Sequence, residues 1–292
     1  MKVEPAVGVI GGSGLYALPG LDEVRWRKVR TPFGDPSDEY CEGRLGDRRV
    51  VFLSRHARGH RLMPTELNYR ANIWGLKSLG AEWVVSVSAV GSMKEHIRPL
   101  DLVIPAQFID LTRRRVSSFF GEGIVAHVGM ADPVCPDLAG AMEKAVDGTG
   151  ATVHRGGTYV CIEGPQFSSR AESTMYRRWG VDVIGMTNMP EAKLAREAEL
   201  CYATVAMVTD FDCWHPDHDA VTVQDIIAVL AANAEKAKGL VARLARDFPR
   251  EHEPCPIGSD RALDNAFITA PEARDPELLK KLDAVAGRVL KA

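Results

Sequence analysis

Hydrophobic residues along the chain gather into short, nearly continuous runs that are separated by polar stretches with a helical period. Runs of this length are typical of strands that are buried on both faces of a sheet. The pattern predicts strands at Val7–Ile10, Val50–Leu53, Trp83–Val90, Leu102–Ile104, Tyr159–Ile162, Val181–Met186 and Tyr202–Val208.

Helices are expected between several of these runs, because glycine, proline and serine mark their ends. Gly80 and Gly180 supply stops, and Pro249 ends the longest helix. The expected helices run from Pro64 to Lys77, from Ser168 or Ser169 to Trp179, from Pro190 through Glu199, from Thr222 to about Phe248 and from Pro276 to Leu290. Strands that alternate with helices predict an α/β fold around a central mixed, largely parallel sheet with helices on its flanks.

The C-terminal part of the chain departs from this alternation. The segment Arg250–Arg274 contains three prolines and little periodicity, so we expect an extended excursion before the last helix. No internal repeat, low-complexity tract or clear linker is evident in the 292 residues. The sequence therefore predicts one domain over residues 1–292, with the excursion and final helix from about residue 250.

Charge and composition argue against several classes of function. The net charge is −3 and no stretch is dominated by Lys and Arg, so nothing favours nucleic-acid binding. The short basic run Arg113-Arg114-Arg115 is interpreted as a solvated turn or a local anion contact. No signal peptide and no run of about 18 apolar residues is visible, and the six cysteines are scattered without a Cys-x-x-Cys pair. These features favour a reduced, cytoplasmic protein.

A glycine-rich turn, Gly11-Gly12-Ser13-Gly14, comes directly after the first expected strand. Its backbone N–H groups can approach an anion closely, and Ser13 adds a hydroxyl donor. Gly12–Ala17 also fits the G-x-G-x-x-A dinucleotide fingerprint, but Pro19-Gly20 interrupts the helix that the fingerprint needs. No second strand with a closing acidic residue is evident about 20 residues later. Phosphate binding is favoured, with dinucleotide binding and a plain tight turn as alternatives.

Arg55-His56 follows the second expected strand, at the end where α/β sheets place their ligands. Arginine recognises phosphate in a bidentate way, and a neighbouring histidine can donate another hydrogen bond. An ordinary surface pair is the alternative. A metal pair formed by His56 and His60 is weaker, because Gly59 lies between them and no carboxylate is close in sequence.

Three further strand ends carry small or polar residues. Ser88–Ser92 closes the third expected strand with residues that let a ligand approach the backbone. Glu163–Arg170 follows another strand, where Phe167 offers a flat face for a planar base and Glu163 can accept from hydroxyls, unless Phe167 is a core aromatic. Met186-Thr187 offers a thioether for a sugar face and a second hydroxyl.

Two carboxylates, Asp210 and Asp212, follow the last expected strand. A carboxyl group in a dry pocket has a raised pKa and can give a proton to a leaving-group nitrogen. A turn in which the aspartates bind the backbone is the alternative. A metal site here is disfavoured because no zinc spacing is matched by the residues that follow, Cys213, His215, Asp217 and His218.

From about Val7 to about Leu240 these motifs resemble the 5′-methylthioadenosine phosphorylases of the purine-nucleoside phosphorylase family. The resemblance is carried by long motifs: Ile10–Leu15, Thr31–Ser37, Asn68–Trp74, Glu163–Ser173 and Thr209–Trp214. It implies the nucleoside phosphorylase fold, assembled as a homotrimer. It also implies phosphorolysis, in which phosphate displaces adenine to give 5-methylthioribose 1-phosphate, a step of purine and methionine salvage. Inorganic phosphate is then a co-substrate, and no cofactor or metal is expected.

The resemblance also assigns roles to residues. Phosphate would be bound by Ser13, Arg55, His56, Ser88, Ala89 and Thr187, with Ser88 standing where eukaryotic members commonly have threonine. The base and ribose would contact Phe167, Ser168 and Met186, while Asp210 and Asp212 read the purine and act in catalysis. The 5′-methylthio pocket would be lined by Val223, Ile226 and Ile227, with His127 lent by a neighbouring subunit.

The aspartates favour a 6-aminopurine on physical grounds. A carboxylate accepts a hydrogen bond from the adenine amine, and a protonated one donates to N7, whereas the carbonyl of a 6-oxopurine would be repelled. A phosphorylase for inosine, guanosine or methylthioinosine is the alternative within the family. An oxidoreductase that uses Gly12–Ala17 and a non-catalytic nucleoside-binding protein are alternatives from other classes.

Overall fold

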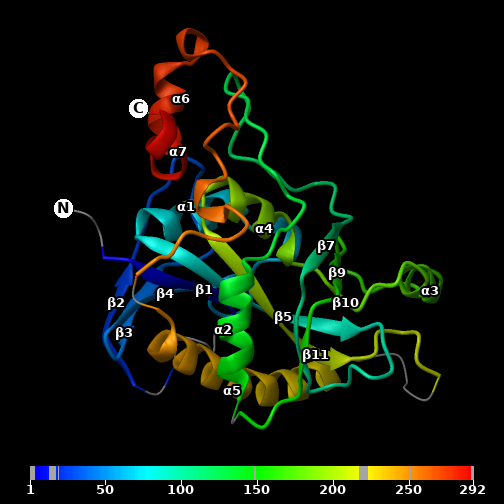
Figure 1. The fold of residues 1–292 in the computed structure, drawn as a ribbon. Coiled ribbons are helices and arrows are strands. Elements are labelled where there is room, and N and C mark those ends of the chain that lie inside the picture. The colour runs from blue at the N-terminus through cyan, green and yellow to red at the C-terminus, as the bar shows by residue number, and fades with distance from the viewer. Residues whose placement is uncertain are drawn as a thin grey trace.

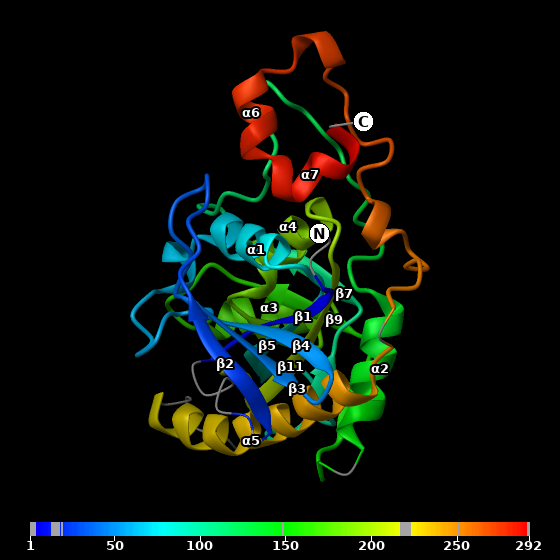
Figure 2. The same cartoon turned by 90° about the vertical axis from the view of Figure 1, so that its left-hand side faces the viewer.

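The computed structural model describes residues 4–12, 18, 20–147, 149–216, 223–249 and 251–290, with the backbone alone at 223–228. The described strands form one eleven-stranded sheet, and helices cover both of its faces (Figure 1). A C-terminal arm, residues 251–290, rises from one end of this body (Figure 2). The mixed α/β fold expected from the sequence is confirmed.

All seven strands that the hydrophobic pattern predicts are present. Four others were missed: β2 is an exposed edge strand with mostly polar residues, and β8 and β7 span only three and four residues. The strands are β1 (Ala6–Gly11), β2 (Leu21–Arg27), β3 (Tyr40–Leu45), β4 (Arg48–Ser54), β5 (Ala81–Ser92), β6 (Leu102–Ile104), β7 (Gln107–Asp110), β8 (Val153–Arg155), β9 (Thr158–Cys161), β10 (Val183–Gly185) and β11 (Cys201–Asp210).

The centre of the sheet is the run β4-β1-β5-β11, in which every neighbouring pair is parallel. The end of β5 also pairs with β10, in the antiparallel direction, so β5 has three partners along its length. β2 and β3 form an antiparallel extension at one edge. A dinucleotide-binding unit needs the strand after the glycine turn to return parallel to β1. Because β2 is antiparallel to β3 and does not pair with β1, the dinucleotide alternative is wrong for this fold.

Helices lie in two layers, one on each face of the sheet. α1 (Tyr69–Ser78) and α4 (Asn188–Glu197) cover one face, and α2 (Pro136–Val146) and α5 (Val223–Asp247) cover the other. α3 (Arg170–Arg178) stands apart at the side of the molecule (Figure 1). The arm carries α6 (Pro276–Lys281) and α7 (Asp283–Leu290), and short 3-10 turns span Pro64–Glu66, Ser259–Arg261 and Pro271–Ala273.

Local sequence explains most helix ends. The Ser169 hydroxyl accepts from the Glu172 N–H, and the Glu172 carboxylate accepts from the Ser169 N–H, so Ser169 rather than Ser168 caps α3. Gly180 follows α3 at φ +82°, a conformation that suits glycine. Two expected helices are broken: a separate 3-10 turn at Pro64–Glu66 precedes α1, and Leu282 separates α6 from α7. The helix α2 was not predicted.

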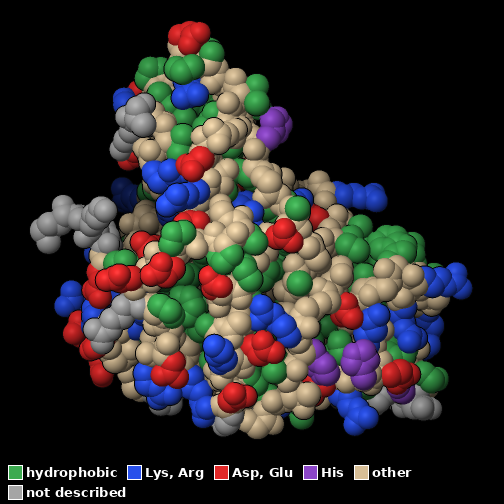
Figure 3. Space-filling model, in the orientation of Figure 1, with side chains coloured by type: hydrophobic (Ala, Val, Ile, Leu, Met, Phe, Trp, Pro, Cys, Tyr) green, Lys and Arg blue, Asp and Glu red, His purple; other side chains and the backbone are tan. Residues whose placement is uncertain are grey.

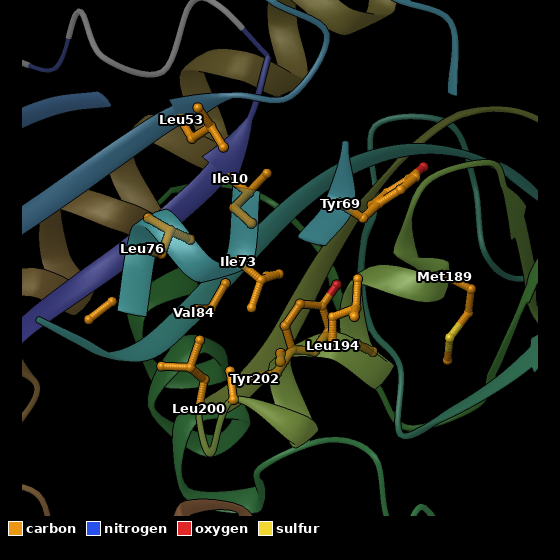
Figure 4. Packing of buried hydrophobic residues seen from close by; sticks show 14 of the residues in the cluster. Ile10, Leu53, Tyr69, Ile73, Leu76, Val84, Met189, Leu194, Leu200 and Tyr202 are labelled. Atoms are coloured by element: carbon orange, nitrogen blue, oxygen red, sulfur yellow. The ribbon is translucent and has the colours of Figure 1, made fainter. Parts of the chain in front are cut away.

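Alternating residues of the central strands form a separate core on each face of the sheet. Val7 and Val9 of β1 pack with α2 and α5, whereas Ile10 belongs to the cluster that includes Ile73 and Leu76 of α1. Figure 4 shows the second cluster, in which side chains from the sheet meet those of α1 and α4. Because these strands are buried on both faces of the sheet, their sequences are nearly continuous runs of apolar residues. Within the described part of the chain, no helix is both long and apolar enough to cross a lipid bilayer.

Candidate active site

The carboxyl ends of β4, β1, β5 and β11 lie along one edge of the sheet, because these neighbouring strands are parallel. In open α/β sheets this edge is where ligands bind. Several candidate residues predicted from the sequence lie there, and hydrogen bonds show which of them the fold brings together.

Arg55 lies just beyond β4 and is held by a buried carboxylate. Its Nε and Nη2 donate to the two oxygens of Glu191 at 2.8 and 3.0 Å, and the two side chains are only 3% and 1% exposed. Nη2 also donates to the Ser86 hydroxyl at 2.6 Å, and Nη1 donates to the Val87 carbonyl at 2.9 Å. An ordinary surface pair is therefore wrong for Arg55. Its guanidinium is fixed by protein partners and keeps one Nη1 hydrogen for a further acceptor.

Glu191 of α4 was not singled out from the sequence, although it organises this cluster. Its Oε1 accepts from Arg55, from the Ser86 hydroxyl at 2.7 Å and from the Tyr202 hydroxyl at 2.9 Å. A charge buried this deeply is retained only when it is paired and hydrogen-bonded. The sequence offered one signal, a carboxylate directly after a proline at the start of the helix.

His56 is partly buried, and its ring is stacked on His60 with centroids 4.3 Å apart. Burial lowers the pKa of His56 to about 4, so the ring is neutral near pH 7. Nδ1 lies 2.8 Å from the Leu62 carbonyl and must carry the proton, because a carbonyl can only accept. Nε2 is then an acceptor, which corrects the expectation of a donating imidazole. The ring can take a hydrogen bond from a protonated phosphate oxygen.

A second polar group is formed by hydroxyls from β5, from β9 and from the start of α4. The Ser88 hydroxyl lies 3.2 Å from the Thr187 hydroxyl and 3.2 Å from that of Tyr159. Ser88 and Thr187 were both candidates for phosphate binding, and the fold places them in contact. Ala89 follows Ser88 in β5 and is partly exposed. Tyr159 was predicted only as part of a strand, and its role in holding Ser88 was missed.

Asp210 ends β11, and both of its carboxyl oxygens accept hydrogen bonds. Oδ1 accepts from the Asp212 N–H at 2.7 Å, and Oδ2 accepts from the Thr209 hydroxyl at 2.5 Å. The backbone-binding turn considered for these aspartates is therefore present. Burial raises the pKa of both Asp210 and Asp212 above the ordinary value. The backbone-binding turn and the carboxyls with raised pKa values therefore occur together in the same two aspartates.

Gly91 of β5 makes room for these carboxyls. A Cβ atom on Gly91 would lie 2.9 Å from Oδ1 of Asp210 and 3.4 Å from Cβ of Asp212. The sequence predicted that a glycine here lets a ligand approach the backbone. In the structure the group that approaches Gly91 is the Asp210 carboxyl. Asp212 itself has φ +52°, a left-handed conformation that aspartate tolerates better than most residues.

Phe167 and Ser168 lie in the loop before α3. Phe167 is 54% exposed, so the alternative of a core aromatic is wrong. The Ser168 hydroxyl oxygen is buried and interacts with the Asp212 carboxyl, where it opposes the effect of burial on the pKa of Asp212. The Ser168 carbonyl accepts from the Cys213 thiol at 3.3 Å. An exposed ring beside this hydroxyl and carboxyl is suited to a ligand that supplies both polar atoms and a flat face.

Arg115 and Glu163 form an ion pair with each other, which is the local anion contact left open for the basic run. The Glu163 carboxylate accepts from the backbone of Arg113 and Arg114 and from the Thr65 hydroxyl, which hold the pKa of Glu163 near 2 against the effect of burial. Its oxygens are thus occupied by protein donors. Arg115 is 1% exposed and donates to the Met186 carbonyl, so it is not a solvated turn.

Met186 is partly buried and packs over Gly164, where a Cβ atom would lie 2.4 Å from its sulfur. His127 is exposed and lies away from this edge of the sheet, on the segment between β7 and α2 that runs beside the arm (Figure 1). Ser13 lies outside the described residues. The same is true of the side chains of Val223, Ile226 and Ile227, although their backbone forms the start of α5.

The metal sites considered from the sequence are not formed by the described residues. His215 Nε2 lies 3.1 Å from a Glu95 oxygen, and Asp217 and His218 fall outside the described residues. Over the described ranges, the one cluster of three or more converging metal-type ligands is Cys135, Cys201 and Cys255. These three cysteines are far apart in the sequence, and the fold brings them together.

Comparison with known proteins identifies the family of this chain. Residues 6–246 match the Phosphorylase superfamily, and the chain belongs to that superfamily. Within it, the chain belongs with the S-methyl-5′-thioadenosine phosphorylases. It is 64% identical to that protein from Bradyrhizobium diazoefficiens over 99% of both chains, and 58% identical to that from Koribacter versatilis over 98% of this chain and 97% of the relative.

Solved structures show the same fold. A methylthioadenosine phosphorylase from an Antarctic soil metagenomic library is 50% identical, with a TM-score of 0.91 over 97% of this chain and 99% of that one. The Schistosoma mansoni enzyme, solved in complex with adenine, is 36% identical, with a TM-score of 0.81 over 85% and 93% of the two chains. The nucleoside phosphorylase fold inferred from the sequence motifs is confirmed.

Proposed function

We propose that this protein catalyses the phosphorolysis of 5′-methylthioadenosine to adenine and 5-methylthioribose 1-phosphate, as a step of purine and methionine salvage. The observation that carries the proposal is the arrangement around β5. Hydroxyls and a fixed arginine suited to an anion lie along the strand, and two carboxyls with raised pKa values lie against its end at Gly91. The names of the relatives point to the same substrate.

Phosphate would bind along β5 and the ends of its neighbours. Arg55 supplies charge and one remaining N–H, Ser88 and Thr187 supply hydroxyls, and His56 Nε2 accepts from the protonated phosphate oxygen. We expect Ser13 and the backbone at Ala89 to add donors. Because Glu191 holds the guanidinium in one orientation, binding phosphate requires little reorganisation of Arg55.

The reaction would replace one bond at the anomeric carbon by another. A phosphate oxygen forms the new bond to C1′ as the bond from C1′ to purine N9 breaks, and the bonding pair moves onto the base. Asp210, whose pKa is raised by burial, would in its protonated form give its proton to N7 and so stabilise the departing adenine. The anionic phosphate would stabilise the positive charge that develops on the sugar.

Asp212 would accept from the 6-amino group of adenine, and Phe167 and Ser168 would contact the base, with Met186 against the ribose. A 6-oxopurine would place a carbonyl opposite these carboxyls and lose the hydrogen bond. A phosphorylase of 6-oxopurine nucleosides is therefore the less favoured candidate. No cofactor enters these steps, and we propose that the enzyme works without one in the cytoplasm.

We further propose a homotrimer in which His127 of one subunit completes the 5′ pocket next to Val223, Ile226 and Ile227 of another. His127 is exposed on its own chain, and large apolar side chains are exposed near it in the sheet-like contact between Val125 and Ile268. Exposed apolar side chains grouped around one segment are typical of a protein interface. Size-exclusion chromatography with light scattering tests the assembly.

A panel of nucleosides tests the reaction. The protein is incubated with methylthioadenosine, adenosine, inosine, guanosine and methylthioinosine, each with and without phosphate, and the free base is measured. We expect phosphate-dependent release of adenine from methylthioadenosine at the highest kcat/KM. Faster release of hypoxanthine or guanine would favour the 6-oxopurine alternative. Binding of methylthioadenosine without any release of base would instead indicate a nucleoside-binding protein.

A further inference from the structure

Three cysteines from distant parts of the sequence meet beneath the C-terminal arm. Cys135 caps the start of α2, Cys201 begins β11, and Cys255 lies near the start of the arm. All three are buried, and their sulfur atoms lie within 4.8 Å of one another. This sulfur cluster lies at the opposite end of β11 from Asp210, about 30 Å away for a strand of this length, so it belongs to no part of the site described above.

The spacing of these atoms resembles that of ligands around a tetrahedral metal ion. Cys135 Sγ and Cys255 Sγ are 3.7 Å apart, and sulfurs bound to one Zn²⁺ at the usual bond length are about 3.8 Å apart. A disulfide would need a separation near 2.05 Å and would leave the third thiol without a partner.

A histidine lies against the same cluster. His252 Nε2 is 3.4 Å from Cys201 Sγ, close to the roughly 3.6 Å expected between a nitrogen and a sulfur on one Zn²⁺. Its ring is stacked on Trp83, with centroids 4.8 Å apart, which turns the ring edge towards Cys201. His252 is not among the donor atoms that lie within 4.8 Å of one another, so its side chain must rotate towards Cys135 and Cys255 before it can share an ion with all three sulfurs. Three thiols and an imidazole are then a donor set that structural zinc sites use.

A cation could reach this cluster, and its charge would be matched there. A cavity of about 590 Å³ is lined by all three cysteines. Two cationic side chains, Lys144 and Arg243, also line the cavity. Five carboxylates outnumber them: Asp137, Asp147, Asp247, Glu251 and Glu253. Three thiolates and one divalent cation leave one negative charge. The buried Arg196 interacts electrostatically with all three sulfurs and can balance that charge.

We propose that Cys135, Cys201, Cys255 and His252 bind one soft divalent cation of the Zn²⁺ class, which fastens the C-terminal arm to the body of the protein. The three sulfurs are already together, and His252 fills the fourth position once its side chain has rotated. With four protein ligands the site is structural, because a catalytic zinc keeps a position for water. Binding releases the thiol protons and joins α2, β11 and the arm through one ion. The site is independent of the phosphorolysis proposed above, and its failure would leave that proposal intact.

The first experiment measures the metal in tag-free protein made in zinc-supplemented medium and purified in reducing buffer without chelator. We expect about one zinc per chain by plasma mass spectrometry. After removal of zinc, Co²⁺ should give the near-ultraviolet thiolate charge-transfer band and the strong visible bands of a tetrahedral site. Protein without stoichiometric zinc and without the cobalt charge-transfer band would overturn the proposal. A disulfide between any two of the three cysteines in this reduced protein would do the same.

Variants then test the ligands. Cys255→Ser should weaken zinc affinity by at least about 100-fold in competition with a chelating dye. His252→Ala should weaken it by about 10- to 100-fold and shift the visible cobalt bands as water replaces nitrogen. Cys41→Ser is the matched control, because Cys41 is equally buried but lies in β3 outside the cluster, and it should keep the metal. Equal zinc affinity in Cys255→Ser and Cys41→Ser would contradict the assignment.

Discussion

The buried pair formed by Arg55 and Glu191 allows a sharp test of how the phosphate site is built. In Glu191→Gln the carboxylate that accepts two Arg55 hydrogen bonds, the Ser86 hydroxyl and the Tyr202 hydroxyl becomes a neutral amide. The guanidinium stays charged and buried without its counter-charge. Removing one partner of such a pair costs about 3 to 5 kcal/mol in free energy of unfolding. At 3 kcal/mol the equilibrium constant of unfolding rises by about 150-fold.

Urea denaturation followed by tryptophan fluorescence measures this loss. Arg55→Met should cost a similar amount, since it leaves the Glu191 carboxylate buried without its counter-charge. The double variant Arg55→Met/Glu191→Met should lose at least about 2 kcal/mol less than the sum of the two single variants, because it leaves no unpaired charge. Glu277→Gln is the control: its partner Lys280 is exposed, and the change should stay within about 0.5 kcal/mol.

Phosphate provides the second half of the test. In Glu191→Gln the anion becomes the main counter-charge of Arg55, so saturating phosphate should stabilise this variant more than it stabilises the wild-type protein. Phosphate should not stabilise the double variant. Losses below about 1 kcal/mol in both single variants, or strict additivity in the double variant, would refute the reasoning that the pair is a tightly coupled unit.

Three further predictions follow from the same structure. Asp210→Asn should lower kcat for methylthioadenosine by about 100-fold or more with little change in stability. In the wild-type enzyme kcat should fall as pH rises through the raised pKa of Asp210, and this fall should disappear in the variant. A pH profile that is the same in both proteins would show that Asp210 does not transfer the proton. Gly91→Ala would place a Cβ 2.9 Å from the Asp210 carboxyl and should cost about 1 to 3 kcal/mol of stability together with activity, whereas wild-type kcat would show that the carboxyl position is unimportant. Burial raises the pKa of Glu197 from 4.5 to about 7, so the folded state binds that proton more tightly than the unfolded state. The resulting stabilisation, about 3 kcal/mol, is complete below pH 4.5 and is lost as pH rises through 7; Glu197→Gln should flatten this slope in urea titrations at several pH values.

The fold could be predicted from the sequence where burial leaves a pattern. β1, β4, β5 and β11 are buried on both faces and read as apolar runs. β2 could not be found in this way, because at the edge of the sheet most of its side chains face solvent. The break between α6 and α7 was missed because its helical pattern continues through Leu282.

The candidate site was predictable in its polar residues at strand ends, but not in the residues that hold them. Ser88 and Thr187 stand out because hydroxyls end apolar runs, and their contact follows from strand pairing. Glu191 and Arg115 act across the fold, and sequence spacing carries no information about such partners. The sulfur cluster was missed for the same reason, since its three cysteines share no local motif.

The C-terminal arm has a consequence for how the chain is made. The Glu199 carboxylate, just before β11, accepts from the Leu263 N–H and from Arg288, so its hydrogen bonds among the described residues come from the arm. The arm leaves the ribosome after the body. The body therefore emerges with this buried carboxylate, and the sulfurs of Cys135 and Cys201, still open to water. The native state is reached only after the arm has emerged, and a nascent chain halted near residue 250 is expected to be a substrate for chaperones and proteases.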